Sequence, residues 1–396
     1  MERKGYFAGL SRNTYLLALA SLFADVSTEM LYPILPIFLT QNLGATATVV
    51  GAVDGVAQAV QNVVQGFSGW LSDRLRRRKG IALVGYVLAA VAKPLIGLST
   101  GWLGVLGARA LDRLGAGTRS APRDALVAAS ADEGSRGKAF GLEGAGDNLG
   151  AFLGPLITLA LIALAAVSLP SIFLLAFVPG LLAALMVLLV REEPIEAHAK
   201  AKLDVHPGRF PKRYWAYLGV TALFGIGNSS NAFLILRTHD LGASLTQTIL
   251  IYALFNLVAA LASYPAGYLS DHLGRKNVLL ASFVIFLVVY AGFGLTTDTA
   301  LLGFLFAFYG LYQGVFRAVG KALASDLVPE EMRASGVGWY MATVGLTGLM
   351  ASLVGGVLWT SVGPPATFCY GAGSALAGSV ALLFFAPAGE PEKQPT

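Results

Sequence analysis

Two acidic residues, Asp25 and Glu29, lie four positions apart within an apolar stretch near the start of the chain. If this stretch is helical, the spacing puts both carboxyl groups on one face of the helix. Two carboxylates on one face repel each other when both are ionised, and burial disfavours the charged form. One of them could therefore take up a proton on one side of a membrane and release it on the other.

Two more ionisable residues, Asp54 and Arg109, fall at a depth similar to that of Glu29 when residues are counted from the ends of their apolar stretches. Because arginine stays protonated in proteins, Arg109 could stabilise an ionised acid nearby. Charge inside a bilayer is costly, so each such residue is a functional candidate. We predict the proton site at Asp25 or Glu29, with Asp54 third.

The alternative to a proton site is a fixed network of ion pairs that holds the helices together. For Asp25 and Glu29, a proton site and a fixed ion-pair network are both possible interpretations. The network is the preferred interpretation for Asp112, Arg113, Glu143 and Asp147. Lys93 has two possible roles, since it could pair with a carboxylate of the second or fourth span or reach toward the membrane surface.

The composition indicates that the chain is a membrane protein. Charged residues make up 13% and hydrophobic residues 55% of the 396 positions, and the mean hydropathy is +0.66. A soluble protein carries charge at about a quarter of its positions. A spanning helix needs about 20 apolar residues, which leaves room for roughly twelve spans and no soluble catalytic domain. We therefore expect no enzyme.

Apolar runs divide the chain into two sets of six. They lie at 14–40, 47–72, 80–99, 101–124, 137–163 and 167–190, and then at 213–237, 245–270, 277–296, 299–325, 335–361 and 366–386. The polar segment 191–212 separates the sets and carries three prolines. We predict an N-terminal bundle at 1–190, a linker at 191–212 and a C-terminal bundle at 213–396, in an all-α fold with twelve transmembrane helices.

The positions of basic residues predict the orientation of the chain. Lysine and arginine gather in alternate connections, at 74–79, 136–138, 275–276 and 333, whereas the other connections have almost none. Because cytoplasmic loops carry this excess, both termini and the linker should be cytoplasmic in a multi-pass inner-membrane protein. The first run lacks a small-residue cleavage site after it, so we read it as a retained helix. The single cysteine, Cys369, excludes an internal disulfide.

The two halves repeat each other in sequence. The segment 69–73 (GWLSD) returns at 267–271 (GYLSD), an offset of 198 residues. The same offset carries 43–45 onto 241–243, Arg119 onto Arg317 and Arg123 onto Lys321. Two parallel six-helix repeats predict a pseudo-twofold axis along the membrane normal and a solute site between the halves.

With these motifs the chain resembles the major facilitator superfamily over essentially its whole length. The family's loop motif after the second span is matched by Gly69, Leu71, Ser72, Asp73, Arg74, Arg77 and Arg78, and again by Gly267, Leu269, Ser270, Asp271, Gly274, Arg275 and Lys276. Arg76 replaces the usual glycine in the first copy. The resemblance implies a cytoplasmic gate, to which we assign Gly69, Asp73, Arg74, Arg77, Gly267, Asp271 and Arg275.

Two further segments are similar to proton-coupled drug and metabolite antiporters of this family. In the fourth span Arg109, Gly115 and Gly117 match, while Asp112 and Arg113 stand where glutamine and glycine are usual. In the fifth span the series Gly146, Gly150, Gly154 and Pro155 matches a glycine-rich motif, and the segment 32–36 (YPILP) matches the first span. Small residues at this spacing also serve ordinary helix packing.

The C-terminal half has aromatic, amide and hydroxyl side chains where the N-terminal half has acids. Such faces suit an amphipathic organic solute, although packing of aromatic residues is the alternative. The predicted solute-binding residues are Tyr32, Asn148, Asn228, Asn231, Phe233, Tyr252, Asn256, Tyr312, Gln313, Arg317 and Trp339. Gly225 and Gly227 indicate that the seventh span is locally unwound, which is tolerated at a cavity.

These features predict a monomeric secondary transporter that moves a small amphipathic solute by alternating access, with proton-coupled efflux favoured. The expected partners are the solute, protons and the lipid bilayer, with no nucleic acid, cofactor or metal. Alternatives are a proton-coupled importer of a nutrient or siderophore and a ferroportin-like metal exporter. The four histidines fall in loops or near helix ends, which disfavours metal export. A non-transporting sensor is the alternative from another class, and the lack of a Gly-x-x-x-x-Gly-Lys-Ser/Thr motif excludes ATP-driven transport.

Overall fold

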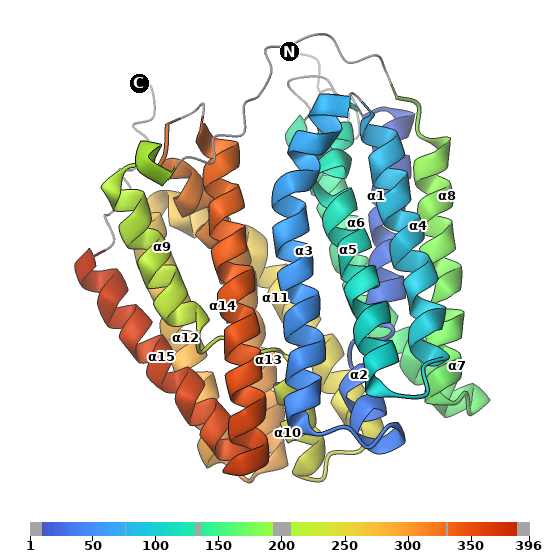
Figure 1. Cartoon of the computed structure of the whole chain (residues 1–396), viewed down its shortest axis with the longest axis vertical. Helices are drawn as coiled ribbons and strands as arrows, with labels where there is room; N and C mark the ends of the chain where they lie inside the picture. The colour runs from blue at the N-terminus through green and yellow to red at the C-terminus, as the bar shows by residue number, and fades with distance from the viewer. Residues whose placement is uncertain (1–9, 76, 131–135, 193–206, 330–331, 386–396) are drawn as a thin grey trace. The chain divides into compact units, whose positions relative to one another are not determined.

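The computed structural model describes residues 10–75, 77–130, 136–192, 207–329 and 332–385 (Figure 1). The regular elements of the first half are helices. They are α1 (Arg12–Glu29), α2 (Leu35–Ile37), the π-helix η1 (Phe38–Asn42), α3 (Ala47–Leu75), α4 (Arg78–Gly97), α5 (Trp102–Ala129), α6 (Arg136–Ala165), α7 (Leu169–Leu175) and α8 (Phe177–Leu189).

The second half is built in the same way. After the short 3-10 helix η3 (Pro207–Arg209) come α9 (Lys212–Gly225), α10 (Ala232–Asp240), α11 (Leu245–Leu273), α12 (Arg275–Leu295), α13 (Thr299–Asp326), α14 (Arg333–Ser361) and α15 (Pro364–Phe385). Gly274 stands between α11 and α12 with φ of +84°, a conformation that favours glycine. The matching position in the first half, Arg76, lies outside the described residues.

The helices cover the twelve predicted spans. Within the described ranges, 8 of them are long and apolar enough to cross a membrane by length and composition. The first and seventh spans are broken into shorter helices, and the second and fourth carry polar and charged residues along their length. The sixth span is also divided, into α7 and α8, where a single helix was expected.

The chain forms two compact units. One consists of Met1–Tyr32 with Val64–Lys202, and the other of Pro33–Val63 with Leu203–Thr396. In the first unit a hydrophobic cluster joins α1, α4, α5, α6 and α8. In the second unit, rings of α9, α12 and α13 pack together, with Phe224 stacked 3.8 Å from Phe283. The predicted bundle boundaries at the linker stay a prediction, since residues 193–206 lie outside the described ranges.

The first and seventh spans are broken at equivalent places. Helix α1 ends at Glu29 and α2 begins at Leu35, while α9 ends at Gly225 and α10 begins at Ala232. An offset of 198 residues carries residue 32 onto residue 230, so the two breaks correspond in the repeat. Pro33 and Pro36 disfavour a continuous helix in the first span. The predicted unwinding of the seventh span is confirmed.

A stripe of glycines lets α6 lie directly against α1. A Cβ atom on Gly146 would lie 2.4 Å from the carbonyl oxygen of Ala18, and one on Gly150 would lie 2.4 Å from that of Leu22. A Cβ atom on Gly154 would lie 2.8 Å from the Cβ atom of Glu29. The glycine-rich motif of the fifth span therefore serves close helix packing.

From the close contact between α6 and α1 we can predict the effect of adding one methyl group to α6. Gly150→Ala should cost about 1–3 kcal/mol of stability, because overpacking forces the backbones apart. Gly144→Ala is the matched control on the same helix, since nothing lies within 4 Å of its added Cβ atom. The control should stabilise the helix by about 0.5–1 kcal/mol. Thermal unfolding of the purified variants in detergent measures both, and equal unfolding temperatures would contradict the packing argument.

Candidate functional site

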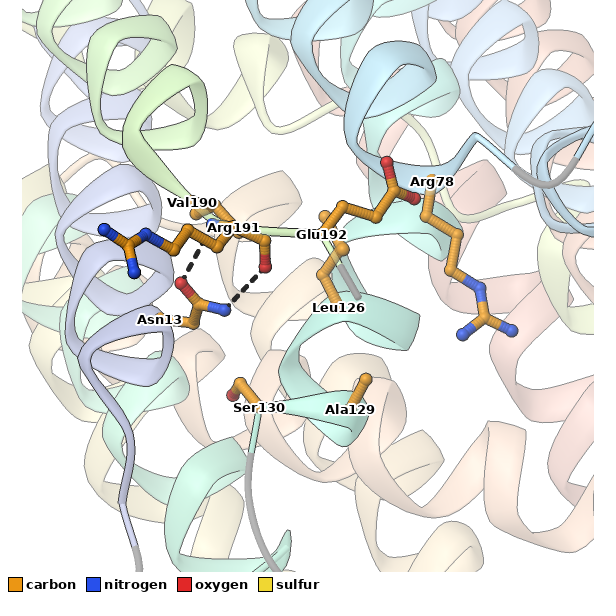
Figure 2. Close-up of a pocket in the computed structure, with 8 residues that line it drawn as sticks. All are labelled: Asn13, Arg78, Leu126, Ala129, Ser130, Val190, Arg191 and Glu192. Carbon is orange, nitrogen blue, oxygen red and sulfur yellow. Dashed lines mark hydrogen bonds between the residues drawn. The ribbon is translucent and has the colours of Figure 1, made fainter. Parts of the chain in front are cut away.

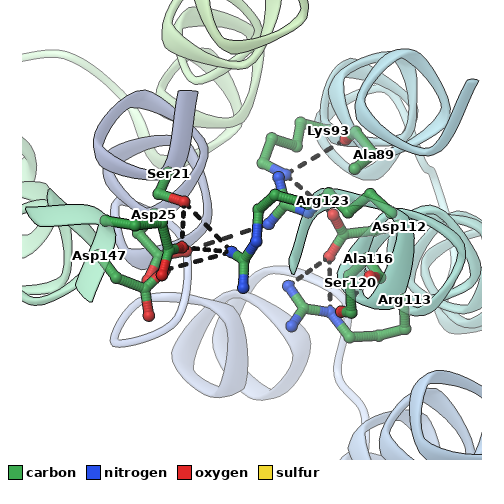
Figure 3. Close-up of polar contacts among 12 residues, drawn as sticks. Ser21, Asp25, Ala89, Lys93, Asp112, Arg113, Ala116, Ser120, Arg123 and Asp147 are labelled. Atoms are coloured by element: carbon green, nitrogen blue, oxygen red, sulfur yellow. Dashed lines mark hydrogen bonds and ion pairs between the residues drawn. The ribbon is translucent and has the colours of Figure 1, made fainter. Parts of the chain in front are cut away.

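Helix α5 carries a stripe of ionisable residues that faces the neighbouring helices of the first unit (Figure 3). The stripe runs from Arg109 through Asp112, Arg113 and Arg119 to Arg123. At about 100° per residue these positions stay near one face of the helix, and 14 residues of helix rise by about 21 Å. The charges thus extend along much of the membrane-spanning part of α5.

One cluster centres on Asp112, whose carboxylate is shared by three cations. Its Oδ1 accepts a hydrogen bond from Lys93 Nζ of α4 at 2.8 Å. Its Oδ2 accepts from Arg109 Nη1 at 2.8 Å and from Arg113 Nε and Nη2 at 2.9 and 2.8 Å. The side chains of Lys93, Arg109 and Asp112 are at most 2% exposed. Of the two roles left open for Lys93, the structure assigns pairing with a carboxylate of the fourth span.

This cluster also fixes the position of Arg109. Besides its bond to Asp112, the Arg109 guanidinium lies 5.5 Å from the ring centre of Tyr32, at the break of the first span. A cation over an aromatic ring is attracted by the electrons of the ring face. Arg109 therefore connects α5 with the broken segment that carries a predicted solute-binding residue.

A second cluster lies further along α5, around Arg123. Arg123 Nη1 lies 2.9 Å from Glu143 Oε1 and 3.9 Å from Asp147 Oδ1, both on α6. Ser21 of α1 donates to Glu143 Oε1 at 2.5 Å and accepts from Arg123 at 3.2 Å. Arg123 also donates to Asp124 Oδ1 at 2.9 and 3.1 Å. These contacts join α1, α5 and α6.

Between the two clusters lies Asp25, one of the predicted proton sites. Arg119 Nη2 is 4.0 Å from Asp25 Oδ1, and the Arg119 guanidinium lies 4.4 Å from the ring centre of Tyr86 on α4. The carboxyl group of Asp147 lies beside that of Asp25 (Figure 3). The charge that faces Asp25 from α5 is therefore Arg119, a residue that the sequence singled out only as part of the repeat.

The structure does not bring all four predicted proton-coupling residues together. Asp25, Glu29 and Arg109 belong to the first unit, whereas Asp54 belongs to the second. Asp54 is buried, and its Oδ2 accepts a hydrogen bond from Ser230 Oγ at 2.6 Å. Asp54 therefore contacts the break of the seventh span.

The break of the seventh span is held by hydroxyl groups from several helices. Tyr290 Oη of α12 donates to the Ser229 carbonyl oxygen at 3.2 Å, and Tyr309 Oη of α13 donates to Asn231 Oδ1 at 3.0 Å. The Ser230 N–H donates to Ser352 Oγ of α14 at 3.1 Å. These bonds replace the helical bonds that the unwound backbone lacks.

The predicted solute-binding residues occupy several environments. Asn228 and Asn231 lie in the break of the seventh span. Phe233, Tyr252 and Tyr312 are buried among aromatic rings, and Trp339 packs 5.8 Å from Trp215. Asn256 and Gln313 are partly buried, whereas Asn148 and Arg317 are exposed. Which of these residues contacts a solute stays a prediction.

Most of the predicted gate falls outside what the structure describes. This holds for the side chains of Asp73, Arg74 and Asp271 and for the surroundings of Gly69. Arg77 is exposed just before α4. Nothing lies within 4 Å of a Cβ atom built on Gly267, and Arg275 pairs with Asp326 at the end of α13. The latch itself stays a prediction.

A small pocket lies where α8 ends, against the first turn of α1 (Figure 2). The Asn13 amide donates to the Arg191 carbonyl oxygen at 2.7 Å and accepts from the Arg191 N–H at 3.0 Å. Glu192 Oε1 accepts from the Lys79 N–H in the first turn of α4 at 3.2 Å. These bonds anchor the first residues after α8.

Sequence reasoning missed three members of these sites: Ser21, Tyr86 and Tyr290. Each is a common residue inside an apolar stretch, and its role depends on which helix lies opposite. Arg119 and Arg123 carried a detectable signal, because they continue the spacing of Arg109 and Asp112 along one face of the same helix. Within the described ranges, no group of three or more His, Cys, Asp or Glu side chains is arranged for a metal ion.

Comparison with known proteins identifies similar chains. Residues 17–236 and 215–396 match the model of the Major Facilitator Superfamily. An uncharacterised MFS-type transporter of Methanocaldococcus jannaschii is 36% identical over 381 residues, which cover 95% of each chain. A probable 4-methylmuconolactone transporter of Cupriavidus pinatubonensis is 30% identical over 356 residues, which cover 84% of this chain and 80% of that protein. The crystal structure of the nucleoside transporter NupG has a TM-score of 0.76 at 15% identity, with 94% and 98% covered.

From the contacts of the Asp112 cluster we expect its members to contribute unequally to the free energy of unfolding. Asp112→Asn should cost about 3–5 kcal/mol, because three cations lose their shared carboxylate. Lys93→Met should cost about 1–3 kcal/mol, since the two arginines still neutralise Asp112. Asp124→Asn, whose side chain is 47% exposed, is the control and should cost little. Thermal unfolding in detergent ranks the three variants by stability. An Asp112→Asn variant as stable as the control would contradict the role of Asp112 in holding the three cations.

The break of the seventh span predicts a role for the hydroxyl of Ser230. This hydroxyl donates to Asp54 and accepts from the Ala232 N–H at 3.0 Å. Ser230→Ala should cost about 1–3 kcal/mol, because the buried Asp54 carboxyl group and the Ala232 N–H each lose a hydrogen bond. Ser230→Thr keeps the hydroxyl and should retain most of the stability. Matching unfolding temperatures for the alanine and threonine variants would show that the hydroxyl is not needed.

Proposed function

Because the chain belongs to the major facilitator superfamily, we propose that it is a secondary transporter that moves a small amphipathic organic solute by alternating access. Proton exchange drives the movement, and export is the favoured direction. The observation that carries this proposal is the ionisable network of α1, α5 and α6, where Asp25 and Asp147 meet Arg119 and Arg123 inside the membrane-spanning part. A chain that only needs stable helices gains little from charges placed there.

The free-energy cost of placing charges inside a membrane supports a role for these charges in proton coupling. Each charge at the bilayer centre costs about 2.5–3.5 kcal/mol on insertion scales. Replacing buried ion pairs by apolar residues is often neutral or stabilising in proteins. An acid and an arginine in contact can change their net charge by one when the acid takes up a proton. A change of net charge alters which conformation is favoured, and this couples proton binding to the transport cycle.

The polar break of the seventh span and the aromatic rings near it support an amphipathic solute. Amide and hydroxyl groups can fix the orientation of a bound molecule while aromatic faces bury its apolar part. The relative named as a probable 4-methylmuconolactone transporter supports a small organic compound, since a lactone is such a molecule. We propose that Asn228 and Asn231 supply hydrogen bonds to the solute.

Export is favoured by the motifs similar to those of antiporters, and a proton-coupled importer is the second candidate for the same site. A metal exporter is disfavoured, because the charged clusters of α5 use arginine and lysine as the partners of their acids. We further propose a monomer in the inner membrane with both termini in the cytoplasm and no cofactor. The gradient of protons would be the energy source.

The proposal predicts solute movement that depends on pH. Purified protein in liposomes should release loaded 4-methylmuconolactone, or another compound found by thermal shift across pH, faster when a pH gradient is imposed. Asp25→Asn and Glu29→Gln should lower the gradient-driven rate at least tenfold, because an amide cannot carry the coupling proton. Asp298→Asn, at an exposed position at the start of α13, is the control and should behave as the wild type does. Flux with unchanged pH dependence in both acid variants would refute proton coupling through this helix.

A further inference from the structure

We propose that Asp25 and Asp147 form a carboxyl pair that binds one proton, with Arg119 and Arg123 as its fixed counter-ions. The proposal rests on the proposed function, because it names the proton site of the coupled transporter. It adds Asp147 on α6 to the acids of α1 and assigns the glycine stripe of α6 a second role. It also gives the two arginines a role that differs from holding helices together.

The glycine stripe brings the two acids together. Gly146 precedes Asp147, and Gly150 lies where a Cβ atom would be 2.9 Å from the Cβ atom of Asp25. With both glycines in place, α1 and α6 approach closely enough for two short side chains to meet across the contact. The carboxyl groups of Asp25 and Asp147 accordingly lie side by side in Figure 3.

The acids of this region outnumber the arginines. Asp25, Glu143 and Asp147 would carry three negative charges and Arg119 and Arg123 carry two positive charges, so full ionisation leaves one negative charge over among these five side chains. The cations Lys93, Arg109 and Arg113 are bound to Asp112 in the other cluster. Asp124 adds a fourth carboxylate, but its side chain is 47% exposed. Glu29, one turn beyond Asp25, adds acid on the same helix face. One bound proton relieves the repulsion between the adjacent carboxyl groups of Asp25 and Asp147.

Distances indicate which acid takes the proton. Glu143 is contacted by Arg123 at 2.9 Å and by the Ser21 hydroxyl at 2.5 Å, so its carboxyl group is more directly compensated than those of Asp25 and Asp147. The arginines lie 4.0 Å from Asp25 and 3.9 Å from Asp147, so each of these carboxylates is weakly compensated. Two adjacent carboxyl groups that share a site favour the state with one proton between them.

A buried hydroxyl gives independent support for a ligand at this place. Tyr86 of α4 is 1% exposed, and its hydroxyl has no hydrogen-bond partner among the described residues. Its ring faces Arg119, which lies 4.0 Å from Asp25. Buried polar groups are normally satisfied, so an orphaned hydroxyl indicates a bound water molecule. Such a water could pass a proton to the pair.

The exposure of the two acids gives the proton a direction. The Asp147 side chain is 43% exposed and that of Asp25 is 23% exposed. A carboxylate that faces lipid is costly, so the exposed side of Asp147 should meet water. Asp147 would then exchange the proton with water, and Asp25 would hold it deeper in the unit, next to Arg119.

Infrared spectroscopy of the purified protein tests the pair without a solute, because protonated carboxyl groups absorb separately from carboxylates. The wild type should show one protonated-carboxyl signal near neutral pH that disappears as the pH is raised. Asp25→Asn and Asp147→Asn should each lose it, since the remaining acid then no longer shares its site with a second carboxyl group. Asp298→Asn is the matched control and should keep the signal, because Asp298 is an exposed residue at the start of α13 and asparagine can also cap a helix. Its persistence at wild-type amplitude in folded Asp147→Asn protein would overturn the proposal.

A double variant tests the charge balance and guards against a folding defect. Arg119→Gln combined with Asp147→Asn leaves Asp25 and Glu143 against one arginine, so the protonated-carboxyl signal should return on Asp25. No return in a double variant that elutes as a single folded species would contradict the balance argument. A further outcome would also overturn the assignment. If sodium chloride abolishes the wild-type signal and choline chloride does not, the pair binds a sodium ion in place of the proton.

The infrared result and the transport result can be told apart. If the signal follows these predictions while solute flux ignores pH, the carboxyl pair stands and the proposed coupling fails. If flux depends on pH while Asp147→Asn keeps the signal, the coupling stands and this pair is wrong.

Discussion

A charge placed inside a membrane must be balanced by groups on neighbouring helices, and the first unit is organised around this constraint. Helix α5 carries five of these charges along one face. The partners come from α4 at Lys93, from α1 at Asp25 and from α6 at Glu143 and Asp147. Because an unbalanced charge is costly, each helix must keep the rotation and depth that hold its partner in place. The charges therefore define how these helices pack.

Besides the charges, close backbone contact between helices also determines how they pack. Gly85 and Gly115 let α4 and α5 approach, since a Cβ atom on either would lie within 2.6 Å of the other's carbonyl oxygen. At the position that corresponds to Asp112, the C-terminal half keeps the close packing and lacks the charge. The residue 198 positions after Asp112 is Gly310, which packs α13 against α11. The two repeats have thus diverged, with ions in one half and aromatic rings and hydroxyl groups in the other.

The sequence predicted the features that depend on composition and local spacing. The spans, the break of the seventh span at Gly225 and the presence of buried charges all follow from runs of apolar residues and from the residues that interrupt them. Pairing between helices could not be predicted in this way. The partner of Arg109 is Asp112 on the same helix, and the cation that faces Asp25 is Arg119. The first pair is an i,i+3 contact that the spacing along α5 allows. The second depends on how α1 and α5 are rotated, and spacing along one helix does not determine that rotation.

Because spacing along one helix does not determine its neighbours, the sequence also did not predict the contact of Asp54 or the surroundings of Tyr86. Asp54 was grouped with Asp25 by depth, yet Asp54 and its partner Ser230 both belong to the second compact unit, whereas Asp25 belongs to the first. Depth along the membrane normal says nothing about which helices lie side by side. Tyr86 looked like an ordinary core residue, and only its unsatisfied hydroxyl distinguishes it.

The central claim is that solute and proton movements are linked through the acids of the first unit. The most direct measurement is the internal pH of liposomes, followed with a trapped pH-sensitive dye, when a gradient of the transported solute is imposed without any pH gradient. Linkage between two ligands is reciprocal, so the solute gradient should move protons through the wild type. The Asp25→Asn and Asp147→Asn variants should leave the internal pH unchanged. A wild type that carries solute at full rate with no change in internal pH would contradict the account.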